Sequence, residues 1–335
     1  MNSQFDKGGQ VAALKTARPN QEVFADTLLE AARRDPNVFV VTSDSRGSAK
    51  LVEFANELPD RVVELGIAEQ NVVGVAAGLA AGGKKVFAVS PACFLTARSL
   101  EQIKNDVAYS DHRVVLVGIS AGVSYGALGS THHSLHDLAA LRALNNVDII
   151  VPADNRQTHL AVSAALDYPR PLYLRFGKRP VPDLPPGADE FRIGRADCIA
   201  EGSDAALVAT GETVWRAMAA RSALAEEGIS CRVLSMHSIR PFDATALLEA
   251  ARSVRAVVSI EEHSVHGGLG EQCAAVLMQE GVRVAYRIMG IPDEYTVTGS
   301  QEEILSHYGI SAQGIAGEIR RLLGSSRRQV SQTRE

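Results

Sequence analysis

The residues best able to do chemistry lie in four short stretches, each of which follows an apolar, β-branched run. The first is GIAEQN at residues 66–71, where a strand ends, a small-residue helix begins and Glu69 stands in the first turn. A carboxylate there also has a purely structural explanation, because the helix dipole favours it. Gly74, Gly78 and Gly82 recur every four residues and give this helix a flat face that another backbone can approach. We therefore expect Glu69 on a tightly packed helix of the kind found between subunits.

A glycine-rich loop after another predicted strand carries His132, His133 and His136. His132 and His136 are four residues apart, so on a helix they would share a face as zinc ligands do, but no third ligand has a matching spacing. Loops at the carboxyl ends of parallel strands commonly hold ligands. We interpret these imidazoles chiefly as substrate contacts, with a polar helix start and a metal site as the alternatives.

Two further motifs have structural explanations. Residues 118–122 (GISAG) match the G-x-S-x-G of serine hydrolases, but a glycine-rich loop follows where a nucleophile elbow needs a helix. Residues 261–270 (EEHSVHGGLG) lack the last glycine of a dinucleotide-binding motif, because Cys273 stands there. The first motif favours a plain strand-end loop, and the second a tight strand-to-helix turn.

The elements that must position these residues alternate between short β-branched runs and longer amphipathic segments. This alternation predicts an α/β fold of two doubly wound domains with mainly parallel sheets, because parallel strands need helical crossovers. In the first block, strands are predicted at 38–42, 61–65, 85–89, 114–119, 147–151 and 172–175, and helices at 21–34, 68–81, 92–109, 134–144 and 155–166. In the second block, strands are predicted at 205–210, 230–235, 255–260 and 284–288.

Domain boundaries follow from composition. Residues 179–187 (RPVPDLPPG) contain four prolines and a glycine, which is typical of a linker. We predict a first domain at 17–178, a linker at 179–190 and a second domain at 191–324. Residues 1–16 and 325–335 are predicted to be flexible tails.

The composition excludes several classes of protein. At about 150 residues per domain, 335 residues predict two domains, and 46% hydrophobic residues with a net charge of −5 exclude a disordered chain and disfavour nucleic acid as a partner. The longest apolar stretch, 72–83, is too short to span a membrane, and no apolar targeting segment begins the sequence. Cys93, Cys198, Cys231 and Cys273 are far apart, so we expect no disulfide framework and a cytoplasmic location.

Taken in order, the motifs resemble the C-terminal half of transketolases. The resemblance covers roughly residues 16–323 and rests on the following segments: GIAEQN (66–71), FLTARSLEQI (94–103), GSTHH (129–133), ALNN (143–146), VPAD (151–154), YLR (173–175), VATGETV (208–214), EEHSVHGGLGEQ (261–272) and MGIPDEYTVTGS (289–300). Each segment is weak alone, and the ordered set is specific. The chain resembles the pyrimidine-binding domain followed by the smaller transketolase C-terminal domain.

The resemblance implies thiamine diphosphate as the cofactor, which carries the carbanion chemistry while the protein orients it. Glu69 would hydrogen-bond a pyrimidine ring nitrogen, so that the cofactor's own amino group takes the proton. Phe94 would stack on the pyrimidine. His132 would contact donor hydroxyls and assist proton transfer, with His133 as a second substrate contact.

For the sugar phosphate, the resemblance implies two contacts. Arg175 would bind the phosphate through its planar guanidinium. Ser48, in the loop after the first strand, would be a further phosphate contact.

A partner is implied by what is missing. Family members bind the diphosphate and its Mg²⁺ through a GDG…N motif, and no GDG occurs in this sequence. The chain therefore resembles one subunit of a split transketolase, active only with an N-terminal-type subunit that supplies the diphosphate and Mg²⁺ site. Family architecture implies a heterotetramer with two copies of each subunit.

Two departures from the family pattern bear on the substrate. Ser120 stands where many transketolases have histidine, and Leu128 where they have an aspartate that contacts a donor hydroxyl. A leucine would leave that hydroxyl unpaired at a cost of ~1–3 kcal/mol. We therefore expect two-carbon ketol transfer with a non-standard sugar phosphate, branched or modified. The alternatives are a beta-type subunit of a 2-oxoacid dehydrogenase, a deoxyxylulose-phosphate synthase-like enzyme, and a non-catalytic scaffold subunit.

Overall fold

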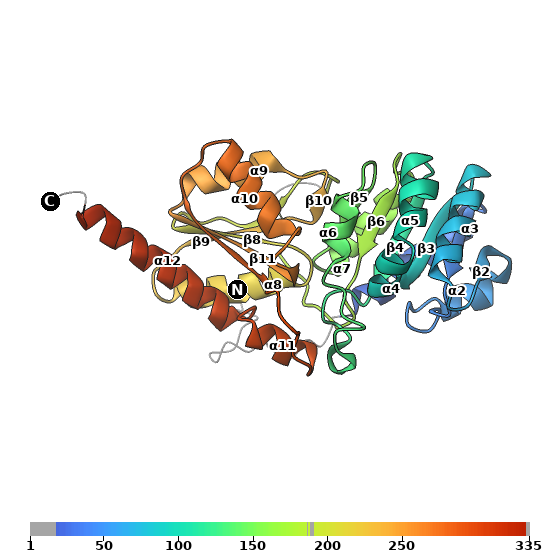
Figure 1. The fold of residues 1–335 in the computed structure, drawn as a ribbon, viewed down its shortest axis with the longest axis horizontal. Helices are drawn as coiled ribbons and strands as arrows, with labels where there is room; N and C mark the ends of the chain where they lie inside the picture. Colours follow the sequence, from blue (N-terminus) through green and yellow to red (C-terminus); the bar gives the residue numbers. More distant parts are fainter. Residues whose placement is uncertain (1–17, 186, 188–190, 333–335) are drawn as a thin grey trace.

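The computed structural model describes residues 18–185, 187 and 191–332. Two α/β units, built around a seven-stranded and a five-stranded sheet, lie side by side along the long axis of the molecule (Figure 1). The predicted tail at 1–16 lies outside the described residues, as do residues 186 and 188–190 of the predicted linker and residues 333–335.

The seven-stranded sheet has the order β10-β5-β6-β4-β3-β1-β2. All neighbours are parallel except β10, which pairs antiparallel with β5. Its strands are β1 (Val38–Thr42), β2 (Val62–Glu64), β3 (Lys85–Pro91), β4 (Val114–Ile119), β5 (Asp148–Ile150), β6 (Leu172–Arg175) and β10 (Ser238–Arg240).

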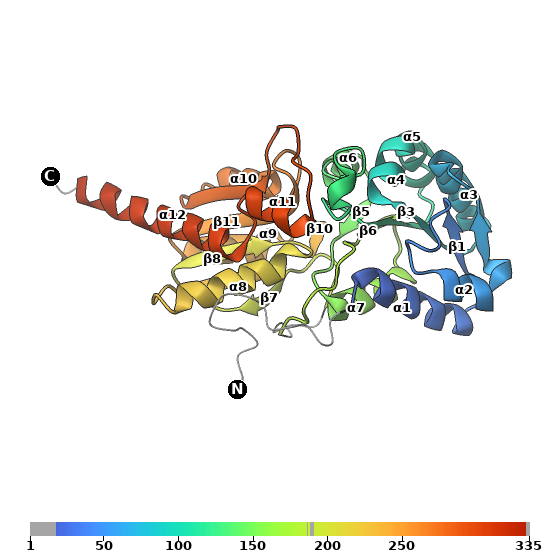
Figure 2. The same cartoon turned by 90° about the horizontal axis from the view of Figure 1, so that it is seen from below.

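The central strands of this sheet are apolar because both faces are covered. Every residue of β4 is buried, as is typical of a parallel strand between two helical layers. One face carries α1 (Asn20–Arg34), α2 (Val52–Glu57) and α7 (Asn155–Ala165), and the other carries α3 (Glu69–Ala81), α4 (Ala92–Arg98), α5 (Leu100–Gln102), the π-helix η2 (Ile103–Tyr109) and α6 (Asp137–Arg142) (Figure 2). Two short 3-10 turns, η1 (Pro59–Arg61) and η3 (Gly126–Leu128), complete this unit.

The five-stranded sheet has the order β12-β11-β8-β9-β7, with only β7 antiparallel to its neighbour. Its strands are β7 (Asp197–Ala200), β8 (Ala205–Ala209), β9 (Cys231–Ser235), β11 (Ala256–Ser264) and β12 (Ala285–Ile291). Its helices are α8 (Thr213–Ala225), α9 (Ala244–Ser253), α10 (Leu269–Gln279), α11 (Gln301–His307) and α12 (Ala312–Gln332). Helices α8 and α12 pack together below this sheet in Figure 1, and α9 and α10 above it.

The predicted fold class, two doubly wound and mainly parallel α/β domains, is confirmed. The elements that were not predicted include the strands β7 and β10 and the helices α2, α11 and α12. The last helix also runs to Gln332, past the predicted end of the domain at residue 324, because residues 325–332 contain neither proline nor glycine to stop it. Across the described helices, none combines the length and the apolar character that crossing a bilayer requires.

Candidate active site

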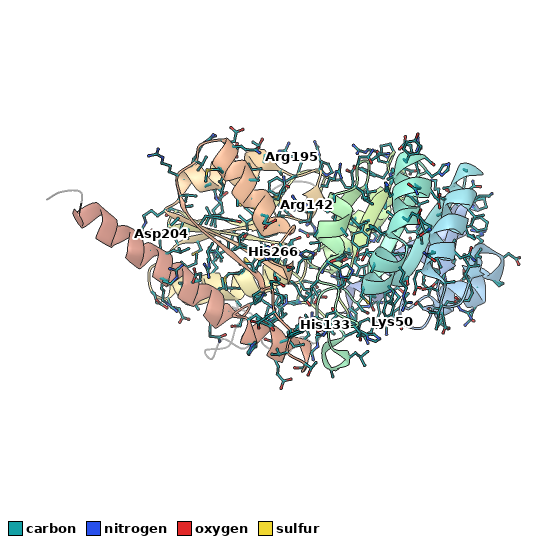
Figure 3. All side chains as sticks on the ribbon, in the orientation of Figure 1. Lys50, His133, Arg142, Arg195, Asp204 and His266 are labelled. Carbon is teal, nitrogen blue, oxygen red and sulfur yellow. The ribbon has the colours of Figure 1, made fainter. Side chains whose placement is uncertain are left out.

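The loops that follow β1, β2, β3, β4 and β6 all leave the seven-stranded sheet at its carboxyl edge, because these strands are parallel. This is the edge at which open α/β sheets bind ligands. Glu69, Phe94 and His132 come from three of these loops or the helices that they enter. Figure 3 labels His133 and Lys50 toward one end of the first unit, in the loops after β4 and β1.

Glu69 is the first residue of α3 and is only 4% exposed. Its two carboxylate oxygens accept hydrogen bonds from Nη1 of Arg98, at 3.0 and 2.9 Å. The Arg98 side chain is 46% exposed, so the ion pair lies where the buried carboxylate reaches the surface. The carboxyl group of Glu69 is thus held in place at the border between the interior and the surface of the protein.

From Arg98 a continuous series of contacts crosses the carboxyl edge. The Arg98 guanidinium lies 4.2 Å from the centre of the Phe94 ring, and Phe94 meets His132 edge-on with ring centres 5.3 Å apart. His132 in turn meets Tyr125 at 5.5 Å, and the Lys178 ammonium lies 4.9 Å from the centre of the Tyr125 ring. We call this set, Glu69, Arg98, Phe94, His132, Tyr125 and Lys178, the carboxyl-edge row.

His132 has one ring nitrogen engaged within the loop. Its Nδ1 lies 2.9 Å from the Thr131 hydroxyl, and the ring is half-buried between Phe94 and Tyr125. Its Nε2 has no hydrogen-bond partner among the described residues. The imidazole is thereby oriented by one nitrogen and free at the other, as a group that contacts substrate must be.

Sequence reasoning did not assign Arg98, Tyr125 and Lys178 to the site. Arg98 follows Phe94 by four residues on α4, so the helical repeat was a usable signal that both face the same side. Lys178 lies three residues beyond the end of β6, at the same edge as the histidine loop, but it stands next to the proline-rich linker. Because of its place beside the linker, Lys178 was not predicted to belong to the site.

His133 is closed off from solvent, at 4% exposure, and its Nε2 lies 2.9 Å from the Gly126 carbonyl oxygen. Its Nδ1 is buried without a partner, and burial lowers the pKa of the ring. A neutral, buried imidazole bonded to its own loop fits a role in shaping that loop. This arrangement gives no support to the predicted contact between His133 and substrate.

Arg175 is the last residue of β6 and is only 6% exposed. It donates to both carboxylate oxygens of Asp137, at 2.7 and 3.3 Å, and to the backbone carbonyls of Ser134 and Glu262. Burial alone would raise the pKa of Asp137, but the Arg175 guanidinium lowers it below its usual value. The guanidinium therefore ties three segments together, and its predicted contact with phosphate finds no support in this geometry.

Ser48 is exposed in the turn after β1, on the carboxyl edge, and its predicted phosphate contact stays a prediction. Ser120 has a positive φ of 53°, an uncommon conformation for a residue other than glycine. Its hydroxyl is buried and accepts a hydrogen bond from Gln21 Nε2 at 3.0 Å, and the chain continues as a loop. The G-x-S-x-G motif therefore forms a strained strand end, with the serine unavailable as a nucleophile.

His136 and the stretch 261–270 are the remaining candidate motifs. His136 Nε2 lies 3.4 Å from the Thr96 hydroxyl, and no group of three or more His, Cys, Asp or Glu among the described residues is placed to hold a metal ion. In the stretch 261–270, the carboxylate of Glu261 accepts from the backbone N–H groups of Leu269 and Gly270, where α10 begins. This stretch is the predicted tight strand-to-helix turn.

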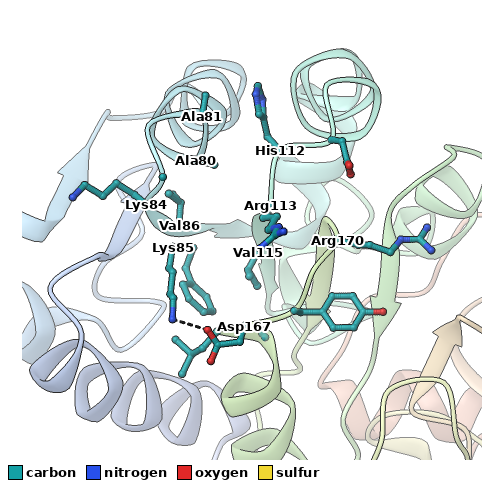
Figure 4. Close-up of a pocket in the computed structure, with 16 residues that line it drawn as sticks. Ala80, Ala81, Lys84, Lys85, Val86, His112, Arg113, Val115, Asp167 and Arg170 are labelled. Atoms are coloured by element: carbon teal, nitrogen blue, oxygen red, sulfur yellow. Dashed lines mark hydrogen bonds and ion pairs between the residues drawn. The ribbon is translucent and has the colours of Figure 1, made fainter.

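A large groove of about 500 Å³ lies at the opposite, amino edge of the sheet, away from all of these residues (Figure 4). Its lining includes Lys84, Lys85, Arg113, Asp167 and Arg170. Lys85 is paired with Asp167 at 2.7 Å, the contact drawn in Figure 4. None of the predicted site residues lies in this groove, so its size does not identify it as the active site.

Comparison with known protein families identifies both units of the chain. The pyrimidine-binding domain of transketolase matches residues 17–183, and the transketolase C-terminal domain matches residues 194–315. The chain belongs to the transketolase family. The carboxyl-edge row lies within the first of these two domains, and the family implies thiamine diphosphate as cofactor.

Several relatives are transketolase subunits rather than whole enzymes. A subunit of the apulose-4-phosphate transketolase of Phocaeicola vulgatus is 50% identical over 293 residues, which span 87% of this chain and 93% of the relative. The 6-deoxy-6-sulfo-D-fructose transketolase subunit SqwH of a Clostridium species is 34% identical, spanning 88% and 91% of the two chains. This chain of the transketolase family is therefore similar to these transferase subunits over most of their length.

The solved structures similar to this chain include transketolases. A split-gene transketolase described as an inactive β4 tetramer superimposes with a TM-score of 0.82 at 35% identity, covering 92% of this chain and 99% of that one. A Pichia stipitis transketolase in complex with sedoheptulose 7-phosphate shares the fold, with a TM-score of 0.79 at 20% identity over 47% of its length.

Proposed function

We propose that this chain is the pyrimidine-binding subunit of a two-chain transketolase that moves a two-carbon ketol unit between sugar phosphates. The observation that carries the proposal is the carboxyl-edge row. It begins at a buried carboxylate and ends at an exposed ammonium, with aromatic and imidazole rings between them. A cofactor ring and a phosphorylated sugar need these groups at the two ends of one site.

The residues present fit the aminopyrimidine end of thiamine diphosphate. A buried carboxyl group that carries a proton can donate a hydrogen bond to a ring nitrogen, and the half-buried Phe94 ring can stack against the heterocycle. Arg98 Nη1 donates to both oxygens of Glu69, so the proton that one oxygen needs in order to donate to the ring nitrogen competes with one of these bonds. When bound, the cofactor supplies the carbanion chemistry, while Glu69 and Phe94 hold and orient it.

The sugar phosphate is expected beside the other half of the row. His132 presents its free ring nitrogen to a donor hydroxyl, and Lys178 is exposed to pair with phosphate. Arg175 is replaced in this role by Lys178, because the guanidinium of Arg175 is already paired with Asp137. Ser48 remains a second candidate for the phosphate, as it is exposed at the same edge.

The diphosphate and Mg²⁺ are assigned to a partner subunit, because the sequence contains no GDG motif. The split-gene relative described as inactive is a tetramer of its β chain alone, which supports a need for a second chain type here. We expect two copies of each subunit in the active assembly.

The substrate is expected to be a non-standard sugar phosphate. Leu128 is 55% exposed on η3, in the loop that carries His132, and offers no hydrogen bond to a donor hydroxyl. The relative that is 50% identical is named for apulose 4-phosphate, which makes this compound the first donor to test.

The test is a kinetic panel on the chain mixed with its GDG-bearing partner, thiamine diphosphate and Mg²⁺. Apulose 4-phosphate, xylulose 5-phosphate and 6-deoxy-6-sulfofructose serve as donors, and pyruvate tests the synthase and dehydrogenase alternatives. The proposal expects ketol transfer from apulose 4-phosphate and none from the chain without its partner. Full activity with xylulose 5-phosphate would overturn the substrate, and turnover of pyruvate would overturn the reaction.

A further inference from the structure

A pair of buried carboxyl groups, Glu212 and Glu262, lies where the second unit packs against the loops of the first. Glu212 precedes α8, Glu262 belongs to β11, and Gln301 at the start of α11 bridges them. Gln301 Nε2 lies 3.1 Å from Glu212 Oε2 and 3.0 Å from both oxygens of Glu262. Glu262 and Gln301 are 5% and 4% exposed, and Glu212 is half-buried with its Oε1 closed off from solvent.

The acid pair has too few hydrogen-bond donors for its oxygens. Two N–H hydrogens of Gln301 and one of the Val123 backbone serve five side-chain oxygens, namely those of Glu212, Glu262 and Gln301. Glu212 Oε1 and Gln301 Oε1 are left without a partner. A buried oxygen without a donor is costly, and one added proton supplies the missing O–H.

The space beside the pair is too small for more than a single water molecule. The cavity beside the pair, lined in part by Thr210, Glu212 and Glu262, has a volume of about 10 Å³. Such a space admits about one water molecule. Bulk solvent therefore does not screen the two carboxylates from each other.

The neighbouring cations are already neutralised. Arg175 is paired with Asp137 at 2.7 Å, and Arg216 is paired with Glu302 at 2.6 Å. Neither guanidinium is left over to balance both members of the acid pair.

The other titratable groups packed around β11 do not balance the acid pair either. His263 is fully buried, and burial lowers its pKa to about 4, so it is neutral at pH 7. Glu261 accepts two backbone N–H bonds, and burial raises its pKa to about 7. Burial and the nearby Glu262 carboxylate raise the pKa of Glu212 to about 8.

The acid pair touches the backbone of both loops that serve the active site. Glu262 Oε1 accepts from Val123 N at 2.7 Å, and a Cβ on Gly122 would come within 2.4 Å of the same oxygen. A Cβ on Gly177, the residue before Lys178, would come within 1.7 Å of Glu212 Oε1. The Gly122 carbonyl also accepts from Ser134 N at 2.8 Å, which closes the loop that holds His132.

We propose that Glu212 and Glu262, linked through Gln301 within the second unit, together hold one proton at neutral pH, and that the half-protonated pair positions the two loops of the first unit that carry His132 and Lys178. Both are positioning residues, since they act through these loops and do not face the row. Loss of the last proton leaves two adjacent anions, whose repulsion moves the loop backbones that they touch. The part concerning His132 and Lys178 rests on the proposed function, and the shared proton does not.

The shared proton is tested on the full chain alone. The infrared spectrum of the wild type at pH 7 should contain a protonated carboxyl band that Glu212→Gln removes and the exposed control Glu226→Gln keeps. The melting temperature gives a second readout, because the folded pair binds a proton up to about pH 8, whereas an ordinary glutamate releases it near 4.5. Stabilisation from this proton is therefore complete below about pH 4.5 and lost as the pH rises to about 8.

Between about pH 5 and 8, the melting temperature of the wild type should fall relative to that of Glu212→Gln, by roughly 3 °C or more. Glu226→Gln should follow the wild type throughout. Parallel curves for all three proteins, together with an unchanged carboxyl band in Glu212→Gln, would overturn the shared proton.

The positioning role is tested on the assembled enzyme from the pH dependence of KM for the sugar phosphate. In the wild type, KM should rise on the order of tenfold above about pH 8 while kcat changes less, and Glu212→Gln should keep KM flat. Equal KM profiles for the two proteins would overturn positioning. No turnover in any protein, wild type included, would count against the proposed function alone, because the spectrum and melting curves decide the shared proton.

Discussion

The two edges of the seven-stranded sheet carry similar residue types in different arrangements. At the amino edge, two of the four Lys and Arg side chains that line the large groove are paired with carboxylates: Lys85 with Asp35 and Asp167, and Arg170 with Asp148. Lys84 instead donates to the Asn37 side chain. At the carboxyl edge, Lys178 lies over an aromatic ring and has no carboxylate partner in the described part of the chain. The difference teaches that a continuous set of acidic, aromatic, imidazole and ammonium groups indicates a candidate active site better than the volume of a cavity does.

The strongest test of this contrast is the removal of one carboxylate from each edge. Glu69→Ala should lower kcat of the assembled enzyme by about 10²–10⁴-fold, because it removes the group that holds the cofactor ring. Asp167→Asn, at the amino edge, should leave kcat within about twofold of the wild type, since exposed ion pairs contribute little. Steady-state turnover of both variants measures this, and equal losses would remove the distinction between the edges.

A second contrast concerns the ion pairs themselves. Asp137→Asn leaves the fully buried Arg175 without its counter-charge and should cost about 3–5 kcal/mol of unfolding free energy, whereas breaking Lys85–Asp167 should cost under about 1 kcal/mol. The lowered pKa of Asp137 means that its stabilisation is present above about pH 3.8 and lost as the pH falls further. Denaturant unfolding at several pH values measures both effects, and a loss under about 1 kcal/mol in Asp137→Asn would contradict the assignment.

A matched pair of lysines sharpens the comparison further. Lys178 lies 4.9 Å from the centre of the Tyr125 ring, and Lys84, at the amino edge, lies 5.4 Å from that of Phe39. Lys178→Ala should raise KM for the sugar phosphate by about 10- to 100-fold, because a charge-assisted hydrogen bond is lost. Lys84→Ala should leave KM unchanged. An unchanged KM in Lys178→Ala would place the phosphate elsewhere at the carboxyl edge, and Ser48 would then be the next candidate for the phosphate contact.

The smallest expected effect concerns selection of the substrate. Leu128→Asp restores the carboxylate that many transketolases carry at this position, so it should shift the ratio of kcat/KM for xylulose 5-phosphate over apulose 4-phosphate by about tenfold. Leu128→Asn is the control that adds polarity without charge. If neither variant changes the ratio, the exposed loop at η3 does not select the donor.

Much of the fold followed from periodicity alone. The buried run 114–119 matches β4 residue for residue, because a strand covered on both faces is apolar throughout. The strands β7 and β10 were missed although β5 and β6, which are equally short, were predicted from their apolar runs. Edge position and antiparallel pairing depend on partners that are distant in the sequence.

As with the fold, some residues of the candidate site could be predicted from the sequence and others could not. Glu69, Phe94 and His132 follow strands of one parallel sheet, so their meeting at one edge could be predicted, while their catalytic roles remain predictions. Arg175 could not be assigned in this way, because a guanidinium suits a carboxylate as well as a phosphate, and Asp137 lies 38 residues away in sequence. Local sequence does not show which of the two partners a guanidinium meets.

The strand β10 has a consequence for the autonomy of the two units. Its residues belong to the second half of the chain, yet they pair with Ile149 and Ile150 at the edge of the first sheet. Proteolysis in the proline-rich stretch at 179–185 should therefore give a nicked protein whose two fragments stay together. A recombinant first half that ends there would expose the backbone of β5 as an open edge, which invites aggregation. A three-residue strand thus ties the two sequence domains together.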